Sequence, residues 1–282
     1  MYPGKAIRLN RLFDKKTHRT LIIPMDHGVT GGNITGLRSL TDAMEDMTKG
    51  GANAVIVHKG AFRLPVESDR DIGRILHLSA STELSPKQHA KVLVSTVEEA
   101  LRLGADAVSL HVNLGNAEES RMLSDLGYVT ETCERWGMPL LAMMYARGPG
   151  IDNEYAPDVV GHCARVGMEL GADIVKIPYT GNAENFADII RCCDIPVVIA
   201  GGPKSETLRQ FLETAHAAIT AGAAGLSVGR NVFQHSDRRR LVRVLGRMIR
   251  RGISVEESLA LAEGKNTFIN AGHERRALFP RK

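Results

Sequence analysis

Short apolar runs rich in β-branched residues recur along the chain, and longer stretches with helical periodicity separate them. The runs have the length of buried strands, and the stretches between them have the pattern of amphipathic helices. We expect strands at Thr20–Met25, Ala54–His58, Lys91–Ser95, Ala107–Val112, Pro139–Tyr145, Asp173–Pro178, Pro196–Ala200 and Gly225–Val228. We expect helices at Leu37–Lys49, Val97–Leu103, Asp125–Trp136, Pro157–Leu170, Ala183–Cys192, Ser205–Ala221 and Asp237–Arg250.

Four of these strands directly follow a Gly-Ala pair, which begins at Gly51, Gly104, Gly171 or Gly222. Glycine adopts the left-handed conformation at little cost, so each pair indicates the end of a helix. The repeat of helix, glycine and short strand is typical of parallel β/α arrays. Eight such strands predict an α/β fold of the closed (β/α)₈ TIM barrel type. The alternative is an open doubly wound sheet, but no GxGxxG sequence follows the first strand.

The other segments fit around one barrel. Residues 59–90 are irregular, and we expect them to hold a long loop and a short helix before the third strand. A helix at 5–18 is expected to cover the bottom of the barrel, and residues 254–264 to form a short helix before a tail at 265–282. Because no linker divides the chain, we expect a single domain over residues 1–282.

A lysine stands in the middle of the sixth predicted strand, in the sequence Asp-Ile-Val-Lys-Ile-Pro-Tyr. Side chains alternate across a strand, so Ile174, Lys176 and Pro178 face one side while Val175 and Ile177 face the other. Inside a barrel, a buried ammonium is costly unless it is paired or loses its proton. A neutral lysine is an amine nucleophile that forms Schiff bases with carbonyl compounds. An ordinary lysine, paired with a carboxylate or reaching solvent, fits this segment equally well.

Glycine-rich sequences follow the last two strands, as Gly201-Gly202-Pro203-Lys204 and Gly229-Arg230. Phosphate sites in TIM barrels are often built from these two exits. Glycines let backbone N–H groups approach an anion, and Arg230 and Lys204 would add positive charge. A lone Gly-Gly-Pro is usually only a turn, but two adjacent exits of this kind predict a sugar phosphate or triose phosphate site.

Asp26 and Tyr145 are the candidate proton-transfer residues, because each follows or ends a strand on the same face of the barrel. Imine formation and C–C cleavage both require proton transfers, which a carboxylate or a phenol can perform. The alternatives are a helix-capping role for Asp26 and a strand-end tyrosine with a satisfied hydroxyl for Tyr145.

Three histidines offer a different interpretation, since His27, His58 and His111 all fall near strand ends on this face. Three imidazoles can hold Zn²⁺, as in metal-dependent aldolases. A single histidine is more often a packing residue or a hydrogen-bond partner, and a zinc site would leave Lys176 without a role. We therefore expect no metal and no other cofactor.

Composition excludes several classes of protein. No apolar run approaches the roughly 20 residues of a membrane span, and the N-terminus has no secretory signal pattern. The four cysteines lack CxxC spacing, which is typical of a reduced, cytoplasmic protein. The formal net charge is +4, and its basic clusters are interpreted as solvated surfaces, so no nucleic-acid partner is expected.

Several motifs stand at the strand ends, namely Pro24-Met25-Asp26-His27-Gly28, Met144-Tyr145-Ala146-Arg147-Gly148, Val175-Lys176, Tyr179-Thr180-Gly181, Gly201-Gly202-Pro203-Lys204 and Ser227-Val228-Gly229-Arg230-Asn231. With these motifs the chain resembles the Schiff-base aldolases that include archaeal-type class I fructose-bisphosphate aldolase. Within that group it is most similar to the 2-amino-3,7-dideoxy-D-threo-hept-6-ulosonate synthases. The similarity runs over nearly the full length.

The resemblance implies roles at the matching positions. Lys176 would form the imine, and Asp26 and Tyr145 would be the acid/base pair. The exits Gly201–Gly202 and Gly229–Arg230 would hold the phosphate, and Lys204, His27 and Arg147 are further candidate substrate-binding residues. For the amino-acid end of an acceptor, Arg147, Lys59 and His111 are candidates by position only. Ala146 departs from the family pattern, in which proline often stands at this position. The resemblance also implies a homo-oligomer, with a decamer among the known forms.

The implied reaction is one aldol cleavage and one aldol addition on the same lysine. A fragment of 6-deoxy-5-ketofructose 1-phosphate would be joined to L-aspartate 4-semialdehyde, on a route to dehydroquinate and aromatic amino acids. The alternatives on the same scaffold are fructose-bisphosphate aldolase, a dihydroxyacetone-phosphate-dependent aminoheptanoate-phosphate synthase and a phosphorylated-diketone thiolase. From a different class, a non-catalytic sugar-phosphate-binding barrel also fits the phosphate motifs.

Overall fold

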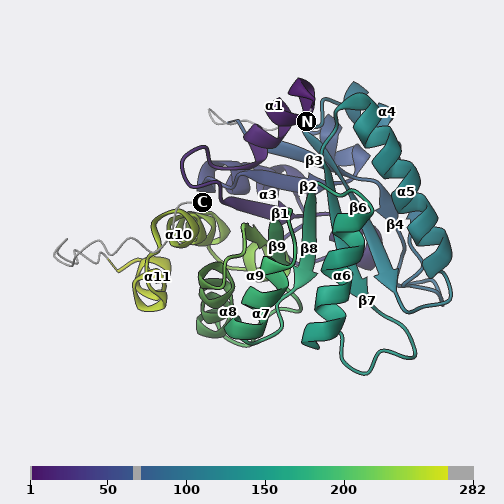
Figure 1. Ribbon diagram of the computed structural model, residues 1–282. Coiled ribbons are helices and arrows are strands. Elements are labelled where there is room, and N and C mark those ends of the chain that lie inside the picture. Colours follow the sequence, from purple (N-terminus) through teal and green to yellow (C-terminus); the bar gives the residue numbers. More distant parts are fainter. Residues whose placement is uncertain (1, 66–70, 266–282) are drawn as a thin grey trace.

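The computed structural model describes residues 2–65 and 71–265. Eight parallel strands form a closed barrel in the order β1-β2-β3-β6-β7-β8-β9-β10, and helices surround it (Figure 1). The barrel strands are β1 (Thr20–Pro24), β2 (Ala54–Val57), β3 (Gly73–His77), β6 (Ala107–Leu114), β7 (Leu140–Ala146), β8 (Ile174–Pro178), β9 (Val197–Ala200) and β10 (Gly225–Ser227). The predicted TIM barrel is therefore confirmed.

The helices lie close to their predicted positions, and most differ by one to three residues at an end. They are α1 (Pro3–Leu12), α2 (His27–Gly31), α3 (Leu40–Gly50), α4 (Val97–Arg102), α5 (Glu119–Trp136), α6 (Pro157–Glu169), α7 (Ala183–Arg191), α8 (Leu208–Thr220), α9 (Arg230–Phe233), α10 (Arg238–Arg251) and α11 (Val255–Ala262), with a short 3₁₀ helix η1 (Lys59–Arg63). The Gly-Ala pairs end helices as predicted, because each of their four glycines has a positive φ.

The predicted third strand is wrong. Residues 91–95 contribute only β5 (Val92–Leu93), which pairs antiparallel with β4 (Ser79–Ala80) outside the barrel. The third position of the barrel is taken by β3, which pairs with β2 and β6. The run Val-Leu-Val has high β propensity, but Val92 is 47% exposed, as expected of a hairpin and not of a barrel strand.

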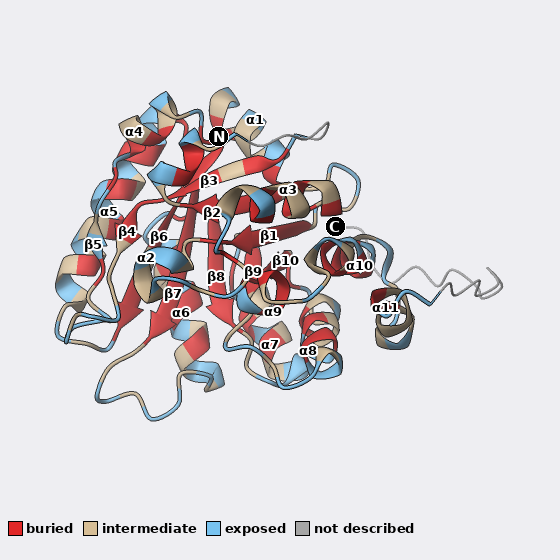
Figure 2. Ribbon diagram, turned by 180° about the vertical axis from the view of Figure 1, so that it is seen from behind, coloured by how far each residue is buried: buried red, intermediate tan, exposed pale blue. Residues whose placement is uncertain are grey.

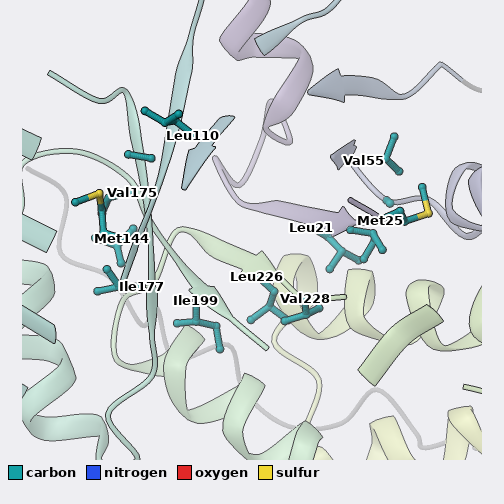
Figure 3. Close-up of a cluster of buried hydrophobic side chains, with 14 of the residues drawn as sticks. Leu21, Met25, Val55, Leu110, Met144, Val175, Ile177, Ile199, Leu226 and Val228 are labelled. Carbon is teal, nitrogen blue, oxygen red and sulfur yellow. The ribbon is translucent and has the colours of Figure 1, made fainter. Parts of the chain in front are cut away.

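Two apolar layers follow from the alternation of side chains along the strands. Inward-facing residues such as Ile22, Ile174 and Val198 fill the barrel interior. Outward-facing residues, including Val175 and Ile177, pack under the helices (Figure 3). The barrel strands are buried along most of their length, while the helices show exposure on their outer faces (Figure 2). This alternation places Lys176 on the inner side of β8.

Helix α1 closes the amino-terminal end of the barrel. Leu12 is fully buried against the interior residues, and Lys5 Nζ lies 3.1 Å from an oxygen of Asp173, just before β8. The helix ends at Leu12, shorter than the predicted 5–18, because a turn held by Asp14 follows it. The opposite end of the barrel remains available for a site.

Two sequence expectations concern other parts of the chain. Residues 266–282, most of the expected tail, lie outside the described residues. Within the described ranges, none of the helices combines the length and apolar character needed to cross a membrane. Cys133, Cys163, Cys192 and Cys193 are all free thiols.

Candidate active site at the carboxyl ends of the strands

Lys176 is 6% exposed in the middle of β8. In register it lies between Met143 of β7 and Val198 of β9, and its Nζ is 4.0 Å from the Met143 sulfur. No carboxylate in the described part of the chain forms an ion pair with Lys176. Lys176 is thus neither solvent-exposed nor paired with a carboxylate, and its amine adjoins a cavity that His27, Tyr145 and Ser227 also line.

A cavity of about 140 Å³ opens beside Lys176 at the carboxyl ends of the strands. Most of the predicted site residues line it, namely His27, Tyr145, Arg147, Lys176, Gly201, Gly202, Gly229 and Arg230. Two predicted residues do not line it: Lys204 is exposed on the loop after β9, and Asp26, which adjoins His27, lines a separate pocket with His58. The barrel therefore brings the lysine, the phenol and both glycine-rich exits to one small space.

The two glycine-rich exits are joined by Asn231 at the start of α9. Its Nδ2 donates to the carbonyl oxygens of Gly201 at 3.0 Å and Pro203 at 3.1 Å, and its Oδ1 accepts from the Ser205 N–H at 2.8 Å. A Cβ on Gly229 would lie 2.7 Å from His27 Cε1, so a larger residue would displace the imidazole. These contacts fix the two exits against each other, as a preformed anion site requires.

Ser227 adds an unused polar atom to this cavity. It is 1% exposed at the end of β10, and its hydroxyl has no hydrogen-bond partner within the described residues. Buried hydroxyls are rarely left unpaired, so this oxygen is suited to contact a bound ligand. Sequence reasoning missed Ser227 as a site residue.

Asp26 follows β1 and forms no capping hydrogen bond with α2, so the capping interpretation does not apply. Its Oδ1 lies 3.5 Å from His27 Nδ1, and neither atom has a hydrogen-bond partner among residues 2–65 and 71–265. Its Oδ2 lies 3.8 Å from Nε2 of His77, the last residue of β3. Buried polar atoms are rarely left without a hydrogen bond, so two such atoms side by side indicate a site that binds a ligand or exchanges a proton with one.

Asp26 lies among ionisable groups that affect its pKa and one another's. Burial by itself raises the pKa of the Asp26 carboxyl, but the positive charges that face it, that of His27 first, outweigh burial and hold the pKa below its ordinary value. Burial lowers the pKa of His27 and brings that of His77 down to about 3. At neutral pH the site therefore combines an ionised Asp26 with a neutral His77, and His27 and His77 lower the Asp26 pKa only where their imidazoles are protonated.

Tyr145 lies between two polar side chains at the end of β7. The guanidinium carbon of Arg147 is 4.5 Å from the centre of the Tyr145 ring, and the His111 ring is 4.8 Å away on a tilted plane. The Arg147 Nε bonds a carboxylate oxygen of Glu154 at 3.2 Å. These contacts fix the phenol at 8% exposure beside the Lys176 cavity.

The wrong third strand concealed two site residues, His77 and Lys91. His77 ends the true strand and is bonded through Nδ1 to Ser109 at 2.8 Å. Lys91 lies on the β4–β5 hairpin and is 8% exposed. The short run Ile75-Leu76-His77-Leu78 was the available signal, since it alternates inward and outward like the other barrel strands.

The three histidines of the zinc interpretation lie in different surroundings. His27 packs edge-on against Phe233, His58 against His77, and His111 on Tyr145. Within residues 2–65 and 71–265, no group of three His, Cys, Asp or Glu side chains is arranged to hold a metal ion.

Comparison with known proteins places this site in a family. The profile of DeoC/LacD family aldolases matches residues 20–235. The chain belongs to the DeoC/LacD aldolase family. It is 44% identical over 255 residues to 2-amino-3,7-dideoxy-D-threo-hept-6-ulosonate synthase 1 of Archaeoglobus fulgidus, covering 90% of this chain and 94% of that protein.

A second curated relative and a solved structure indicate the type of reaction. A 2-amino-4,5-dihydroxy-6-oxo-7-(phosphonooxy)heptanoate synthase of Streptomyces griseus is 42% identical over 235 residues, 83% of this chain and 86% of that one. A solved Schiff-base-forming fructose-1,6-bisphosphate aldolase superposes with a TM-score of 0.81 at 29% identity, covering 87% and 99% of the two chains. This aldolase is therefore an enzyme of the class I, Schiff-base-forming aldolase and transaldolase type, as the sequence predicted.

Proposed function

We propose that this aldolase is a 2-amino-3,7-dideoxy-D-threo-hept-6-ulosonate synthase that uses Lys176 as its imine-forming residue. The 44% identity to the Archaeoglobus fulgidus synthase over 90% of this chain carries the proposed product, and the cavity shared by Lys176, Tyr145 and the two glycine-rich exits supports the imine chemistry. Lys91 is the other buried lysine near the mouth, but it does not line this cavity. The position of Lys176 thus supports it as the amine that meets a phosphorylated ketone.

The steps follow from imine chemistry. The Lys176 amine adds to the donor ketone, and the resulting carbinolamine loses water to give the imine. The donor C–C bond then breaks, its electron pair forms the enamine, and the departing hydroxyl gives up its proton as it becomes an aldehyde. The enamine attacks the acceptor aldehyde, the new alkoxide takes up a proton, and water releases the product from Lys176.

Two side chains are suited to these proton transfers. Tyr145 lines the cavity beside Lys176, and the unpaired Oδ1 of Asp26 lies next to His27, which also lines it. Because Asp26 is ionised, it can accept a proton from carbinolamine or hydroxyl groups, and Tyr145 can donate one. Gly201, Gly202, Gly229, Arg230 and Ser227 are suited to hold the phosphate.

The acceptor can be deduced from the names of the relatives. Both synthase products are seven-carbon acids with a 2-amino group and a ketone at carbon 6. An aldol bond to the carbon beside this ketone joins carbons 4 and 5, so the acceptor is a four-carbon 2-amino acid with a terminal aldehyde. That compound is L-aspartate 4-semialdehyde, and the donor would be 6-deoxy-5-ketofructose 1-phosphate. The product would enter a route to aromatic amino acids.

One observation favours a second candidate, the 7-(phosphonooxy)heptanoate synthase activity. The phosphate-type exits and Lys176 line the same small cavity, which suits a ketone with its phosphate on the adjacent carbon. The Streptomyces griseus product has this arrangement, whereas the 7-deoxy product has no phosphate there. A dihydroxyacetone-phosphate donor would fit this alternative.

Product analysis with two donors tests both candidates. The enzyme is incubated with L-aspartate 4-semialdehyde and either 6-deoxy-5-ketofructose 1-phosphate or dihydroxyacetone phosphate, and products are identified by mass spectrometry. We expect the 7-deoxy acid from the first donor. Formation of only the phosphorylated acid establishes the second candidate. Absence of any product, together with no borohydride-trapped adduct on Lys176, favours a non-catalytic sugar-phosphate-binding barrel.

We further propose a single-domain, cytoplasmic enzyme that assembles as a homo-oligomer. The four free thiols support a reducing compartment. Large exposed apolar side chains on α5, Tyr128 and Trp136, support a buried subunit contact. Light scattering of the purified enzyme tests the assembly, and a monomeric mass would contradict it.

A further inference from the structure

The loop between β7 and α6 ends beside the Lys176 cavity, in a turn that holds Tyr155. The Asn153 side-chain oxygen accepts from the Tyr155 N–H at 2.9 Å, and the Asn153 carbonyl accepts from the Ala156 N–H at 3.2 Å. Helix α6 begins directly afterwards, at Pro157. The backbone of Tyr155 is therefore fixed on both sides, by the turn and by the helix.

The side chain of Tyr155 reaches the glycine-rich exit of β9. Its hydroxyl oxygen lies 4.0 Å from the point that a Cβ on Gly202 would occupy. Gly202 has a φ of +60°, a conformation that glycine adopts at little cost. Tyr155 also lines the Lys176 cavity together with Gly202 and Arg230. The hydroxyl is therefore beside the β9 exit, in the cavity that both exits share.

The Tyr155 hydroxyl is free to donate to a ligand. It forms no hydrogen bond within residues 2–65 and 71–265, and the residue is 38% exposed. Burial first, and then the charge of Glu154, raises the pKa of the Tyr155 phenol. At neutral pH the phenol thus keeps its proton, and an anionic oxygen is the acceptor to which it would bond most strongly.

The cations that line the cavity differ in their availability to an anion. Arg147 bonds Glu154, which lines the same cavity and offsets its charge. No carboxylate in the described ranges forms an ion pair with Arg230, so this guanidinium is available to a phosphate. A phosphate monoester has three terminal oxygens, and the exits with Arg230 leave room for a further donor. Tyr155 is the neutral donor that the structure places there.

We propose that the Tyr155 hydroxyl binds the substrate phosphate together with Arg230 and the N–H groups of the β9 exit. The inference rests on the proposed function for the phosphate itself, which both candidate donors carry. Tyr155 lies well beyond the end of β7 in the sequence, where the rule that active sites follow barrel strands does not point to a particular side chain.

Two measurements on Tyr155→Phe test this contact, because the substitution removes the hydroxyl and keeps the ring. In calorimetry, the dissociation constant of inorganic phosphate should rise roughly 5- to 50-fold, as expected for one hydrogen bond between a half-exposed phenol and an anion. In borohydride trapping, half-maximal labelling of Lys176 should require a similarly higher concentration of 6-deoxy-5-ketofructose 1-phosphate or dihydroxyacetone phosphate, whichever forms the adduct. Labelling by hydroxyacetone, which lacks the phosphate, should change less than about threefold.

Tyr179→Phe is the matched control. Tyr179 follows β8 and packs edge-on against Phe186, with ring centroids 5.1 Å apart, and it does not line the Lys176 cavity. Its loss of a hydroxyl should leave the phosphate dissociation constant and both labelling concentrations within about threefold of the native values. Circular dichroism verifies that both variants are folded.

Two results would overturn the inference. In one, the native enzyme binds no phosphate, or its dissociation constant agrees with that of Tyr155→Phe within about threefold. In the other, Tyr155→Phe weakens labelling by hydroxyacetone as much as labelling by the phosphorylated ketone, so that Tyr155 acts on the ketone. Failure of the proposed function is distinct, because the native enzyme would then trap no ketone on Lys176, while calorimetry would still decide the role of Tyr155.

Discussion

The two sides of the barrel mouth offer a ligand different kinds of group. On the side of β8, β9 and β10, the site offers the buried amine of Lys176, glycine backbone, the Ser227 hydroxyl and the guanidinium of Arg230. On the side of β1, β2, β3 and the hairpin, it consists of Asp26, Lys91 and several imidazoles that influence one another's charge. The first side is suited to hold a ketone and a phosphate, and the second to move protons.

The division of roles is tested most strongly at Lys176. Lys176→Ala should reduce turnover by more than about 10⁴-fold, because no imine can form without the amine. Phosphate binding should remain near normal, since the glycine exits are untouched. Turnover, and the binding of inorganic phosphate measured directly by calorimetry, are the measurements.

The position of the adduct sharpens this prediction. After borohydride reduction with donor, peptide mass spectrometry should find the adduct on Lys176, and Lys91→Met should still be labelled. An adduct on Lys91, or retained turnover in Lys176→Ala, would place the imine on the other side of the mouth.

Asp26→Asn should give the next largest effect. The substitution keeps the shape of the side chain and removes its capacity to accept a proton, so kcat/KM should fall by about 10²- to 10⁴-fold. Imine trapping with the donor should persist at equilibrium, because the amine is unchanged. A variant with near-native kcat/KM would show that the hairpin side does not transfer the proton.

Arg230→Met should affect donor binding and not the chemical step. Loss of one charged contact to phosphate should raise the donor KM roughly 10- to 100-fold with little change in kcat. Lys204→Met is the matched control, since Lys204 is exposed and does not line the cavity, and its donor KM should change less than about threefold. Equal effects of the two substitutions would move the phosphate site outward onto the loop after β9.

The sequence predicted the β8–β10 side far better than the hairpin side. Lys176 could be placed because alternation along a short strand fixes which side chains face inward. The glycine exits could be placed because they directly follow their strands. Both inferences need only the local sequence and the rule that active sites of TIM barrels lie at the carboxyl ends of the strands.

The hairpin side depends on contacts that are distant in the sequence. The strand β3 begins with Gly73, where a Cβ would lie 2.8 Å from the Leu12 side chain, so packing against α1 selects a residue with low β propensity. Lys91–Ser95 has the better local propensity, yet it pairs with β4. His77 and Lys91 were therefore missed, and the charge environment of Asp26 could not be foreseen.

The smallest predicted effect is on stability in acid, and it arises from the hairpin side. Burial holds the pKa of His77 at about 3 in the folded state, whereas the ordinary histidine pKa is 6.5. Between these two pH values the unfolded chain binds a proton at His77 and the folded state does not. Stability is therefore fully present above pH 6.5 and declines as pH falls toward 3, by at most about 1.4 kcal/mol per pH unit for this group.

His77→Gln should reduce this dependence, because it removes the titrating ring while keeping an amide that can bond Ser109. The free energy of unfolding in urea, measured at pH 7 and pH 5, should fall less on acidification in His77→Gln than in the native enzyme. His162→Gln, at an exposed histidine of α6, should behave like the native enzyme. If acidification destabilises the native enzyme and His77→Gln equally, His77 is not the neutral, buried neighbour of Asp26 that the proton-transfer role of this side requires.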